Sequence, residues 1–365
     1  MKQEIWRKFD YWLFGVVLIL CIFGIAMIRS AIAGNVKLSG LVGRQAIYVG
    51  FGLVIIIVVA MIDYHYWASL SRVMYAVTVV ALLVIYVVGA ARFGSARWLD
   101  TGLILIQPSE IAKIVVILVL ANYFDKTQHR DRDWRWVIYS FLLTFGVVIW
   151  ILLQPNLSTS IVIFVLWFAL IWLSGLPPKY IAVFVGGGIM GIAALFPFLQ
   201  GYQKLRILDF IFPNPSARHG NTYNVDQALI SIGSGGWFGE GYGHSTQVQL
   251  RFLKVRHTDF IFSALSAEFG LIGALVVLAL LIFVVLRCIR AARLAPDLFG
   301  AMIAYGFAIL ILFQTAVNVG VNLNVIPVTG LTLPFISYGG SSLISFVLGI
   351  GLVESVVARN KSLEK

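Results

Sequence analysis

The stretch that decides the fold runs from Asp259 to Arg287 and reads DFIFSALSAEFGLIGALVVLALLIFVVLR. It is longer than the about 20 mostly apolar residues that a helix needs to cross the hydrocarbon core of a bilayer. Between its charged ends, Glu268 is the one ionisable residue. The stretch therefore predicts a membrane-spanning helix, and similar stretches recur along the chain.

The composition of the whole chain indicates a polytopic membrane protein. Of the 365 residues, 60% are hydrophobic and 12% are charged, and the mean hydropathy is +0.93. Soluble domains are about 45–50% apolar and about 25% charged, so this chain has too few charges to solvate a globular surface. A soluble enzyme, a disordered chain and a disulfide-stapled secreted module are excluded. Cys21 and Cys288 lie in or beside apolar runs, and no disulfide framework is expected.

Ten apolar windows predict an all-α protein with about ten transmembrane helices. They cover residues 11–33, 45–63, 73–91, 108–124, 136–153, 158–176, 179–199, 259–287, 299–322 and 335–358. The first window is too long to be a cleaved signal peptide. An even number of spans places both termini on one side of the membrane. We expect residues 1–365 to form a single integral membrane domain.

The distribution of positive charge orients these spans. The termini and the even-numbered connections hold 15 Lys and Arg residues, whereas the short odd-numbered connections hold four, which are Lys37, Arg44, Arg92 and Arg97. Because cytoplasmic connections carry an excess of Lys and Arg, we expect both termini in the cytoplasm. Residues 200–258 then form a large extracytoplasmic loop between the seventh and eighth spans.

The net charge of +11 indicates the kind of partner. The basic residues are scattered between apolar runs and do not form the stripe that binds nucleic acid. They indicate anionic membrane lipid or an anionic lipid-linked substrate as the partner, and not nucleic acid.

The polar motifs gather at the predicted outer ends of the spans. They lie at 97–98, 107–113, 154–156, 203–259 and 327–342. The cytoplasmic connections are short and carry only scattered charge. This one-sidedness indicates a reaction site at the outer leaflet. It disfavours a transporter, which needs polar groups along a path through the membrane.

Glu110 and Lys113 are ionisable residues inside a predicted span. Pro108 suits the first position of a helix, with Gln107 as a weak cap, and Glu110 falls in the first turn. Residues three apart share a helix face, so Glu110 and Lys113 can pair. Charges inside a membrane are candidates for function. An ion pair that only fixes helix packing fits the spacing equally well.

Asp259 is the second ionisable candidate. We expect Thr258 to cap the eighth span and Asp259 to lie in its first turn, beside Arg256 and His257. Glu268 lies about half a turn around the helix and ~13 Å along its axis, too far for the paired carboxylates of a glycosidase. Asp259 therefore acts alone or with groups from other spans, or it merely complements the helix dipole.

Two glycine-rich motifs and the histidines have simpler interpretations. The run 233–243 offers backbone N–H groups that suit phosphate, but a flexible loop that lets the chain turn fits it better. The small residues in 338–342 favour close helix packing. The five histidines show no metal-ligand spacing, and no metal site is predicted.

As a set, these motifs resemble the SEDS family, which includes RodA and FtsW. The resemblance covers nearly the whole chain and rests on RWL at 97–99, QPSEIAK at 107–113, GSGG at 233–236, HTDFIF at 257–262 and PFISYGGS at 334–341. It implies a peptidoglycan glycosyltransferase that polymerises lipid II into a lipid-linked glycan strand outside the bacterial cytoplasmic (inner) membrane. It also implies a class B penicillin-binding protein, a transpeptidase, as partner. The short N-terminus favours a RodA-like role in cell shape, with FtsW-like cell division as the alternative.

The resemblance also implies roles for individual residues. Asp259 would be the catalytic carboxylate, and Glu110 and Lys113 would be important for function. We expect Asp259 to act as the base in a single inverting displacement that releases undecaprenyl pyrophosphate. Lys113, with Arg206 and Arg256 as weaker candidates, would counter the pyrophosphate charge. The candidate substrate-binding residues are Arg97, Gln107, Ser109, Gln203, Arg206, Arg256, His257, Thr258, Ser337 and Tyr338.

One motif departs from the family pattern. Members usually have Gln-Pro-Asp-x-Gly-Thr between spans five and six, whereas here residues 154–159 read QPNLST. Because Asn156 and Ser158 replace the Asp and the Gly, a role of that aspartate in binding a cation is not carried over. No cofactor is assigned, although a pyrophosphate leaving group would suit a divalent cation such as Mg²⁺ or Mn²⁺. Two other functions stay open, a flippase for lipid-linked precursors and a non-catalytic scaffold for a transpeptidase.

Overall fold

The protein is described by a computed structural model. It covers residues 6–88, 99–100, 105–178, 200–213 and 220–360, and the single residues 180, 184, 186, 187 and 197. This part of the chain is helical except for one antiparallel pair of two-residue strands, β1 (Leu99–Asp100) and β2 (Leu105–Ile106). The all-α prediction is therefore confirmed.

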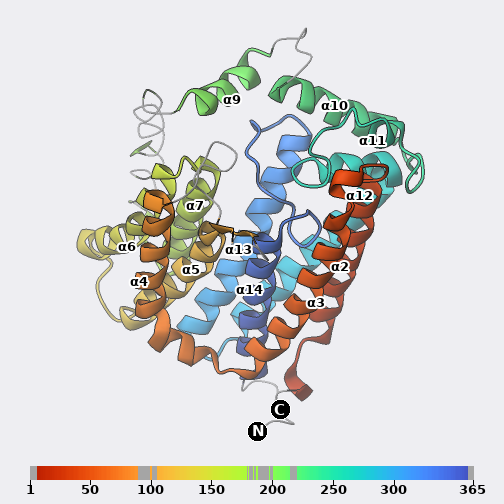
Figure 1. The fold of residues 1–365 in the computed structure, drawn as a ribbon. Helices are drawn as coiled ribbons and strands as arrows, with labels where there is room; N and C mark the ends of the chain where they lie inside the picture. The colour runs from red at the N-terminus through yellow and green to blue at the C-terminus, as the bar shows by residue number, and fades with distance from the viewer. Residues whose placement is uncertain are drawn as a thin grey trace.

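Nine long helices of the described chain form a bundle (Figure 1). They are α2 (Tyr11–Ala31), α3 (Gly40–Met61), α4 (Tyr64–Val88), α5 (Pro108–Lys126), α6 (Trp134–Leu153), α7 (Leu157–Leu173), α12 (Ile261–Arg293), α13 (Leu298–Asn322) and α14 (Gly340–Ala358). Each overlaps one predicted window, and the window 179–199 lies almost entirely outside the described residues. Seven described helices are long and apolar enough to cross a membrane. α5 and α7 are not among them, because α5 carries charged residues and α7 is shorter.

The helices divide into inner and outer members. Within the apolar window of α14, 83% of the residues are buried, against 22% in α4. The outer helices expose large apolar side chains, such as Val77 on α4 and Phe51 on α3. An apolar exterior suits a lipid environment, where burying apolar surface between helices gains little. α13 and α14 thus form the centre, in contact with α5 and α12.

The first and last helices begin and end at the same end of the bundle, which we call the terminal end (Figure 1). There Lys8 Nζ donates a hydrogen bond of 3.0 Å to the carbonyl of Asn360. The two ends of the described chain thus lie together.

The opposite end, which we call the loop end, is covered by the predicted large loop (Figure 1). That segment contains three helices, α9 (Gly201–Ile211), α10 (Asn221–Ser234) and α11 (Thr246–Gln249). α9 is stabilised by a capping box in which the side chains of Gln200 and Gln203 bond the opposite backbone N–H. α10 packs against α12 and α13. The polar segment thus contains helices as well as turns.

The helix α12 is broken at Gly270, where φ is 66° and ψ is −167°. The backbone of the glycine run replaces the lost helical hydrogen bonds. Leu271 N donates to Gly236 O at 2.8 Å, and Gly241 N donates to Glu268 O at 3.0 Å. A Cβ on Gly239 would lie 2.2 Å from the Glu268 carbonyl oxygen, so only glycine allows this approach. The run 233–243 therefore turns the chain, as predicted, and also holds the break.

Several helices start at other residues than predicted. α4 begins at Tyr64, nine residues before its window, and two starts near Asp259 also differ. α12 begins at Ile261 after Phe260, and the Thr258 hydroxyl donates to Val255 O at 3.2 Å instead of capping the helix. The reason is a turn at 255–260, in which the N–H groups of Thr258 and Phe260 both donate to Val255 O. Asp259 therefore precedes the helix. Likewise, α14 begins at Gly340, because residues 334–339 form turns that pack against the 257–258 backbone.

Candidate functional site

Asp259 lies at the loop end, and its backbone is held by α13. The carbonyl of Asp259 accepts hydrogen bonds from the Nδ2 atoms of Asn318 and Asn322, each at 3.0 Å. Asn318 Nδ2 also donates to Leu331 O at 2.8 Å. The two amides thus connect Asp259 to the segment after α13. Neither was among the predicted site residues, although two amides one turn apart in an apolar span were a usable signal.

The segment between α13 and α14 also contacts the turn that carries Asp259. Ser337 Oγ donates to Thr258 O at 2.8 Å, and Tyr338 N donates to His257 O at 2.9 Å. The structure therefore brings together four predicted substrate-binding residues, His257, Thr258, Ser337 and Tyr338. Ser337 is buried, and its hydroxyl also accepts from Leu333 N, so it shapes the site through the backbone.

Arg206 reaches the same place from α9. Its Nη1 donates to the carbonyls of Val328 at 3.3 Å and Thr329 at 3.2 Å. A Cβ on Gly330 would lie 3.8 Å from Asp259 Oδ2 and 4.0 Å from Arg206 Nη1. The carboxylate and the guanidinium therefore face the same glycine, which has a φ of +81°.

Burial sets the acidity of Asp259. Its side chain keeps some exposed surface, but protein atoms surround it densely, and this burial raises the pKa of Asp259 to about 6. Arg206 and a hydrogen bond with Thr258 oppose the increase. Burial and the charge of Arg256 lower the pKa of the neighbouring His257. The site thus holds a carboxylate that titrates near neutral pH beside a cation.

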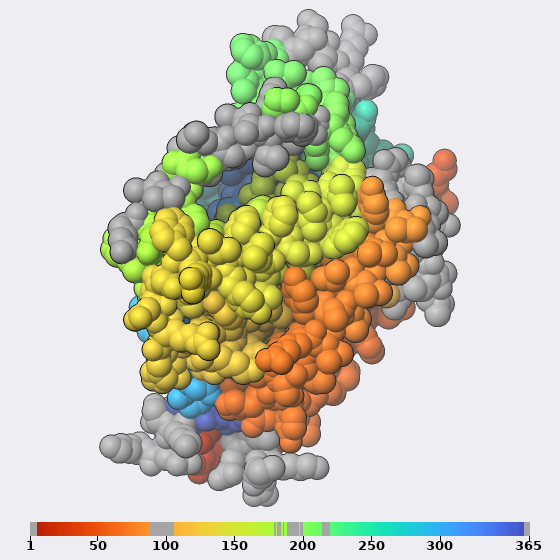
Figure 2. All heavy atoms as spheres, turned by 90° about the vertical axis from the view of Figure 1, so that its left-hand side faces the viewer, coloured from red at the N-terminus to blue at the C-terminus, as the bar shows by residue number. Residues whose placement is uncertain are grey.

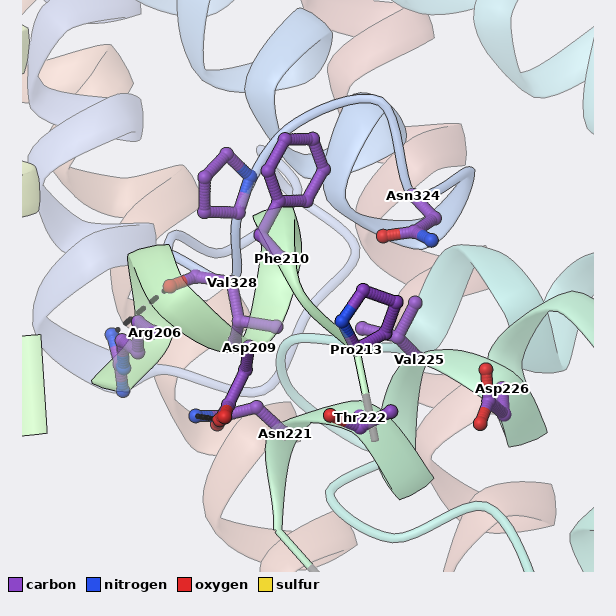
Figure 3. A pocket seen from close by; sticks show the side chains of 11 residues that line it. Arg206, Asp209, Phe210, Pro213, Asn221, Thr222, Val225, Asp226, Asn324 and Val328 are labelled. Atoms are coloured by element: carbon purple, nitrogen blue, oxygen red, sulfur yellow. Dashed lines mark hydrogen bonds between the residues drawn. The ribbon is translucent and has the colours of Figure 1, made fainter. Parts of the chain in front are cut away.

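A small pocket with a volume of about 30 Å³ adjoins this site between α9, α10 and the segment after α13 (Figure 3). Arg206 forms one wall, and Asn221 Nδ2 donates to Asp209 Oδ2 at 3.2 Å within it. Its lining also includes Phe210, Asp226 and Asn324. Its volume leaves room for water next to Arg206, and its lining offers hydrogen-bonding groups to that water.

The Glu110–Lys113 pair forms as predicted. Lys113 Nζ lies 2.8 Å from Glu110 Oε2, and the Lys113 side chain is 1% exposed. The ammonium also lies 5.6 Å from the ring centroid of Phe346, and Ser345 Oγ donates to Glu110 O at 3.0 Å. Pro108 is at the helix start, and Gln107 makes no side-chain cap. Glu110 and Lys113 thus pair with each other, and their contacts with Ser345 and Phe346 link α5 to α14.

Polar side chains connect the start of α5 to its neighbours. Gln107 N donates to Ser341 Oγ at 3.0 Å, and Gln107 Nε2 donates to Ser109 Oγ at 3.0 Å. Asn156 Nδ2 reaches the same Ser109 hydroxyl at 3.4 Å. Two predicted substrate-binding residues, Gln107 and Ser109, therefore lie in a network within the protein.

The two residues that depart from the family pattern both have structural contacts. Asn156 caps α7 by accepting a hydrogen bond from Thr159 N at 3.3 Å. Ser158 Oγ donates at 2.6 Å to the carbonyl of Thr329, which also accepts from Arg206. An amide caps a helix about as well as a carboxylate, so the substitution keeps the local fold.

The other predicted residues serve the fold or lie outside the description. Arg256 is buried and donates to the carbonyls of Ala31 and Leu253. Gln203 is buried and accepts from Gln200 N at 2.9 Å. Arg97 lies outside the described residues. Within the described part of the chain, no three His, Cys, Asp or Glu side chains come together as a metal site.

Comparison with known proteins shows which proteins this chain is similar to. Residues 11–362 match the cell cycle protein family of FtsW, RodA and SpoVE. The peptidoglycan glycosyltransferase MrdB of Escherichia coli K12 is 34% identical over 371 residues, which cover 100% of this chain and 98% of MrdB. A probable peptidoglycan glycosyltransferase FtsW of Hydrogenovibrio crunogenus is 36% identical, with 94% and 90% covered.

A solved structure is also similar to this chain. A chain of a peptidoglycan synthase complex that coordinates polymerization and crosslinking superposes with a TM-score of 0.81 at 30% identity, covering 97% of this chain and 98% of that chain. The chain therefore belongs to the family of FtsW, RodA and SpoVE, the SEDS family.

Proposed function

We propose that this protein is a peptidoglycan glycosyltransferase that polymerises lipid II at the outer face of the bacterial cytoplasmic membrane. Its relatives MrdB and FtsW carry that activity in their names and match at least 94% of the chain. The observation that carries the proposal is Asp259, a carboxylate with a pKa of about 6 beside Arg206 at the loop end. A base whose pKa lies near the working pH is best suited to general base catalysis.

The reaction needs one proton acceptor and one group that stabilises the departing charge. Asp259 takes the proton from the acceptor sugar hydroxyl, whose oxygen forms the new bond to the anomeric carbon of the donor. The bond from that carbon to the pyrophosphate breaks, and undecaprenyl pyrophosphate leaves with the electron pair. The single displacement inverts the anomeric carbon and needs no second carboxylate.

Arg206 is the cation that we assign to the leaving pyrophosphate. It faces the same glycine as Asp259, whereas Lys113 is sealed against Glu110 and Arg256 is buried against α2. A preorganised cation aimed at developing charge is a large contribution to such catalysis. Lys113 and Glu110 then act as positioning residues that hold α5 on α14. No step is assigned to a divalent cation.

The arrangement of the site suits a lipid-linked substrate. Figure 2 shows the side formed by α4, α6 and α7, where a hollow lies above the yellow residues. Blue residues of the C-terminal part are visible at the bottom of the hollow (Figure 2). An opening on the side of a membrane protein allows a lipid-linked sugar to reach the interior without leaving the bilayer.

We further propose ten spans with both termini in the cytoplasm and Asp259 outside. The common terminal end and the 15 basic residues at the termini and the even-numbered connections support this topology. We also propose a class B penicillin-binding protein as partner, supported by the similar chain that belongs to a peptidoglycan synthase complex. A role in cell shape, as for RodA, is the favoured one.

Polymerisation by the purified protein tests this function. The full chain, with and without its transpeptidase partner, is incubated with lipid II, and glycan polymer is measured by gel electrophoresis. We expect polymer with the wild type and none above background with Asp259→Asn. The matched control is Glu240→Gln, which removes a carboxylate in the glycine run at the same end and should retain polymerisation.

Each failure has a defined meaning. Polymer at the wild-type rate from Asp259→Asn would refute the base assignment. Absence of polymer from the wild-type complex would refute the glycosyltransferase and favour a scaffold. Transfer of lipid II across vesicles without polymer would favour a flippase.

A further inference from the structure

The terminal end carries a polar network of its own, which contradicts the prediction that it holds only scattered charge. Asp10 Oδ1 accepts from Leu13 N at 3.1 Å and caps α2, and Asp10 Oδ2 lies 2.5 Å from Arg287 Nη2. Asp10 N donates to Glu354 Oε2 at 3.0 Å. Asp10 and Glu354 are thus engaged inside the bundle.

A pocket with a volume of about 270 Å³ lies beside this network. It is lined by residues 7–12, by the last turns of α12 and by the end of α14. Its cations are Arg7, Lys8, Arg287 and Arg290, and its one carboxylate is Asp10, already paired with Arg287. Among the described residues, neither Arg7 nor Arg290 forms an ion pair, and both are exposed. The pocket therefore has uncompensated positive charge.

The surroundings of the pocket indicate the membrane interface. Tyr11 and Trp12 line it and are 59% and 72% exposed, as expected of aromatic residues at the headgroup level. The exposed face of α2 continues from Trp12 through Ile19 and Ile22. An apolar face therefore leads from the pocket along α2 towards the middle of the membrane.

The helix α12 provides a second apolar face next to it. Leu286 and Ile282 lie four and eight residues before Arg290, so the three share one side of the helix. Leu286 and Ile282 are both exposed, and α12 is in contact with α2. Positive charge at the interface thus continues into two adjacent apolar faces.

We propose that this pocket binds the headgroup phosphate of an anionic phospholipid, whose acyl chains lie along α2 and α12. Arg7 and Arg290 supply the charge-assisted hydrogen bonds, and a guanidinium matches two phosphate oxygens at once. Basic pockets between helices at the cytoplasmic face are suited to such headgroups. A soluble phosphate would use the cations but not the apolar faces. The site is distinct from the polymerisation site at the loop end.

Lipid binding to the full-length protein in detergent tests the proposal. Binding of the first lipid is measured by native mass spectrometry with phosphatidylglycerol and, separately, with zwitterionic phosphatidylcholine. We expect the wild type to prefer phosphatidylglycerol. Because each cation near the surface contributes about 1 kcal/mol, Arg7→Gln/Arg290→Gln should weaken that binding by about 10-fold to 30-fold.

Matched variants separate the pocket from general charge and from misfolding. Arg130→Gln/Arg135→Gln removes two exposed arginines of the predicted cytoplasmic connection between α5 and α6, which do not line the pocket, and should change affinity less than about twofold. Arg7→Lys/Arg290→Lys retains the charge and should keep the preference for phosphatidylglycerol, with an affinity between those of the wild type and Arg7→Gln/Arg290→Gln, because an ammonium cannot bind two phosphate oxygens in the same way. Equal binding of the two lipids by the wild type would overturn the proposal. Wild-type affinity in Arg7→Gln/Arg290→Gln would overturn it as well.

The source of the phosphate is tested with glycerol phosphate as competitor. At concentrations equal to the lipid it should not displace phosphatidylglycerol, because it lacks acyl chains. Displacement with equal affinity would overturn the lipid assignment and favour a soluble phosphate ligand.

Discussion

Two carboxylate–cation sets of the protein differ in how they are built. Glu110 and Lys113 come from one helix, lie 2.8 Å apart and are sealed from solvent. Asp259 and Arg206 come from two segments of the loop end and face each other across Gly330. Asp259 and Arg206 both belong to the described part of the chain, and they form no direct ion pair there.

This difference separates a structural role from a chemical one. A buried ion pair satisfies its own charges and leaves neither group available to a substrate. An unpaired carboxylate with a pKa of about 6 can accept a proton, and a nearby unpaired guanidinium can meet developing negative charge. We therefore expect the first set to govern stability and the second to govern rate.

The largest expected effect is on the rate of Asp259→Asn. Replacing the base by an amide of the same shape should lower polymerisation about 10²-fold to 10⁴-fold, the usual contribution of a positioned base. The thermal midpoint of the purified variant should stay close to that of the wild type. A large fall in that midpoint would show that Asp259 supports the fold, and the comparison would lose its basis.

The next effect is on stability and concerns Lys113→Met. This variant leaves Glu110 buried without its partner, which should cost about 3–5 kcal/mol. Thermal unfolding in one detergent measures the loss. The double variant Glu110→Leu/Lys113→Met removes both charges and should recover most of it. An unchanged midpoint in Lys113→Met would mean that the pair contributes nothing to packing of α5 on α14.

The third prediction concerns pH. Asp259 must be ionised to act as base, so the rate should fall as the pH drops through about 6. Arg206 lowers the pKa of Asp259, and Arg206→Gln should therefore raise it and move the rising limb of the profile to higher pH. The kcat/KM of polymerisation, measured across pH, tests this. Arg206→Lys should keep the limb near its original position. If the limb did not move in Arg206→Gln, Arg206 would have no influence on the pKa of Asp259.

The smallest effect is expected for Asn156→Asp, which restores the carboxylate usual in the family. Both side chains can cap α7, so the free energy of unfolding should change by less than about 0.5 kcal/mol. Chemical denaturation in mixed micelles measures it. A gain in polymerisation rate that depends on added Mg²⁺ or Mn²⁺ would show that the family aspartate binds a cation and that this chain has lost the site.

Local features of the sequence predicted much of the fold. The lengths of the apolar windows located nine described helices, because a chain that crosses lipid must satisfy its backbone hydrogen bonds within each span. The spacing of Glu110 and Lys113 predicted their pairing, because residues three apart share a helix face. Both inferences need only the neighbours along the chain.

Features that depend on irregular turns or on distant segments were not predicted correctly. Thr258 resembles a cap, but the turn at 255–260 uses its hydroxyl and moves the start of α12 to Ile261. The break at Gly270 is stable only because the glycine run supplies the missing hydrogen bonds. Asn318 and Asn322 became site residues only through their contacts with Asp259.

The sequence by itself determined that the chain is a helical membrane protein of the SEDS family, with Asp259 as the carboxylate to examine. Only the tertiary structure decided which cation accompanies it. Lys113 and Arg256 find partners inside the bundle, and α9 brings Arg206 to Gly330. The physical reason is that spacing settles contacts within one helix, whereas a site between segments depends on how the whole bundle packs.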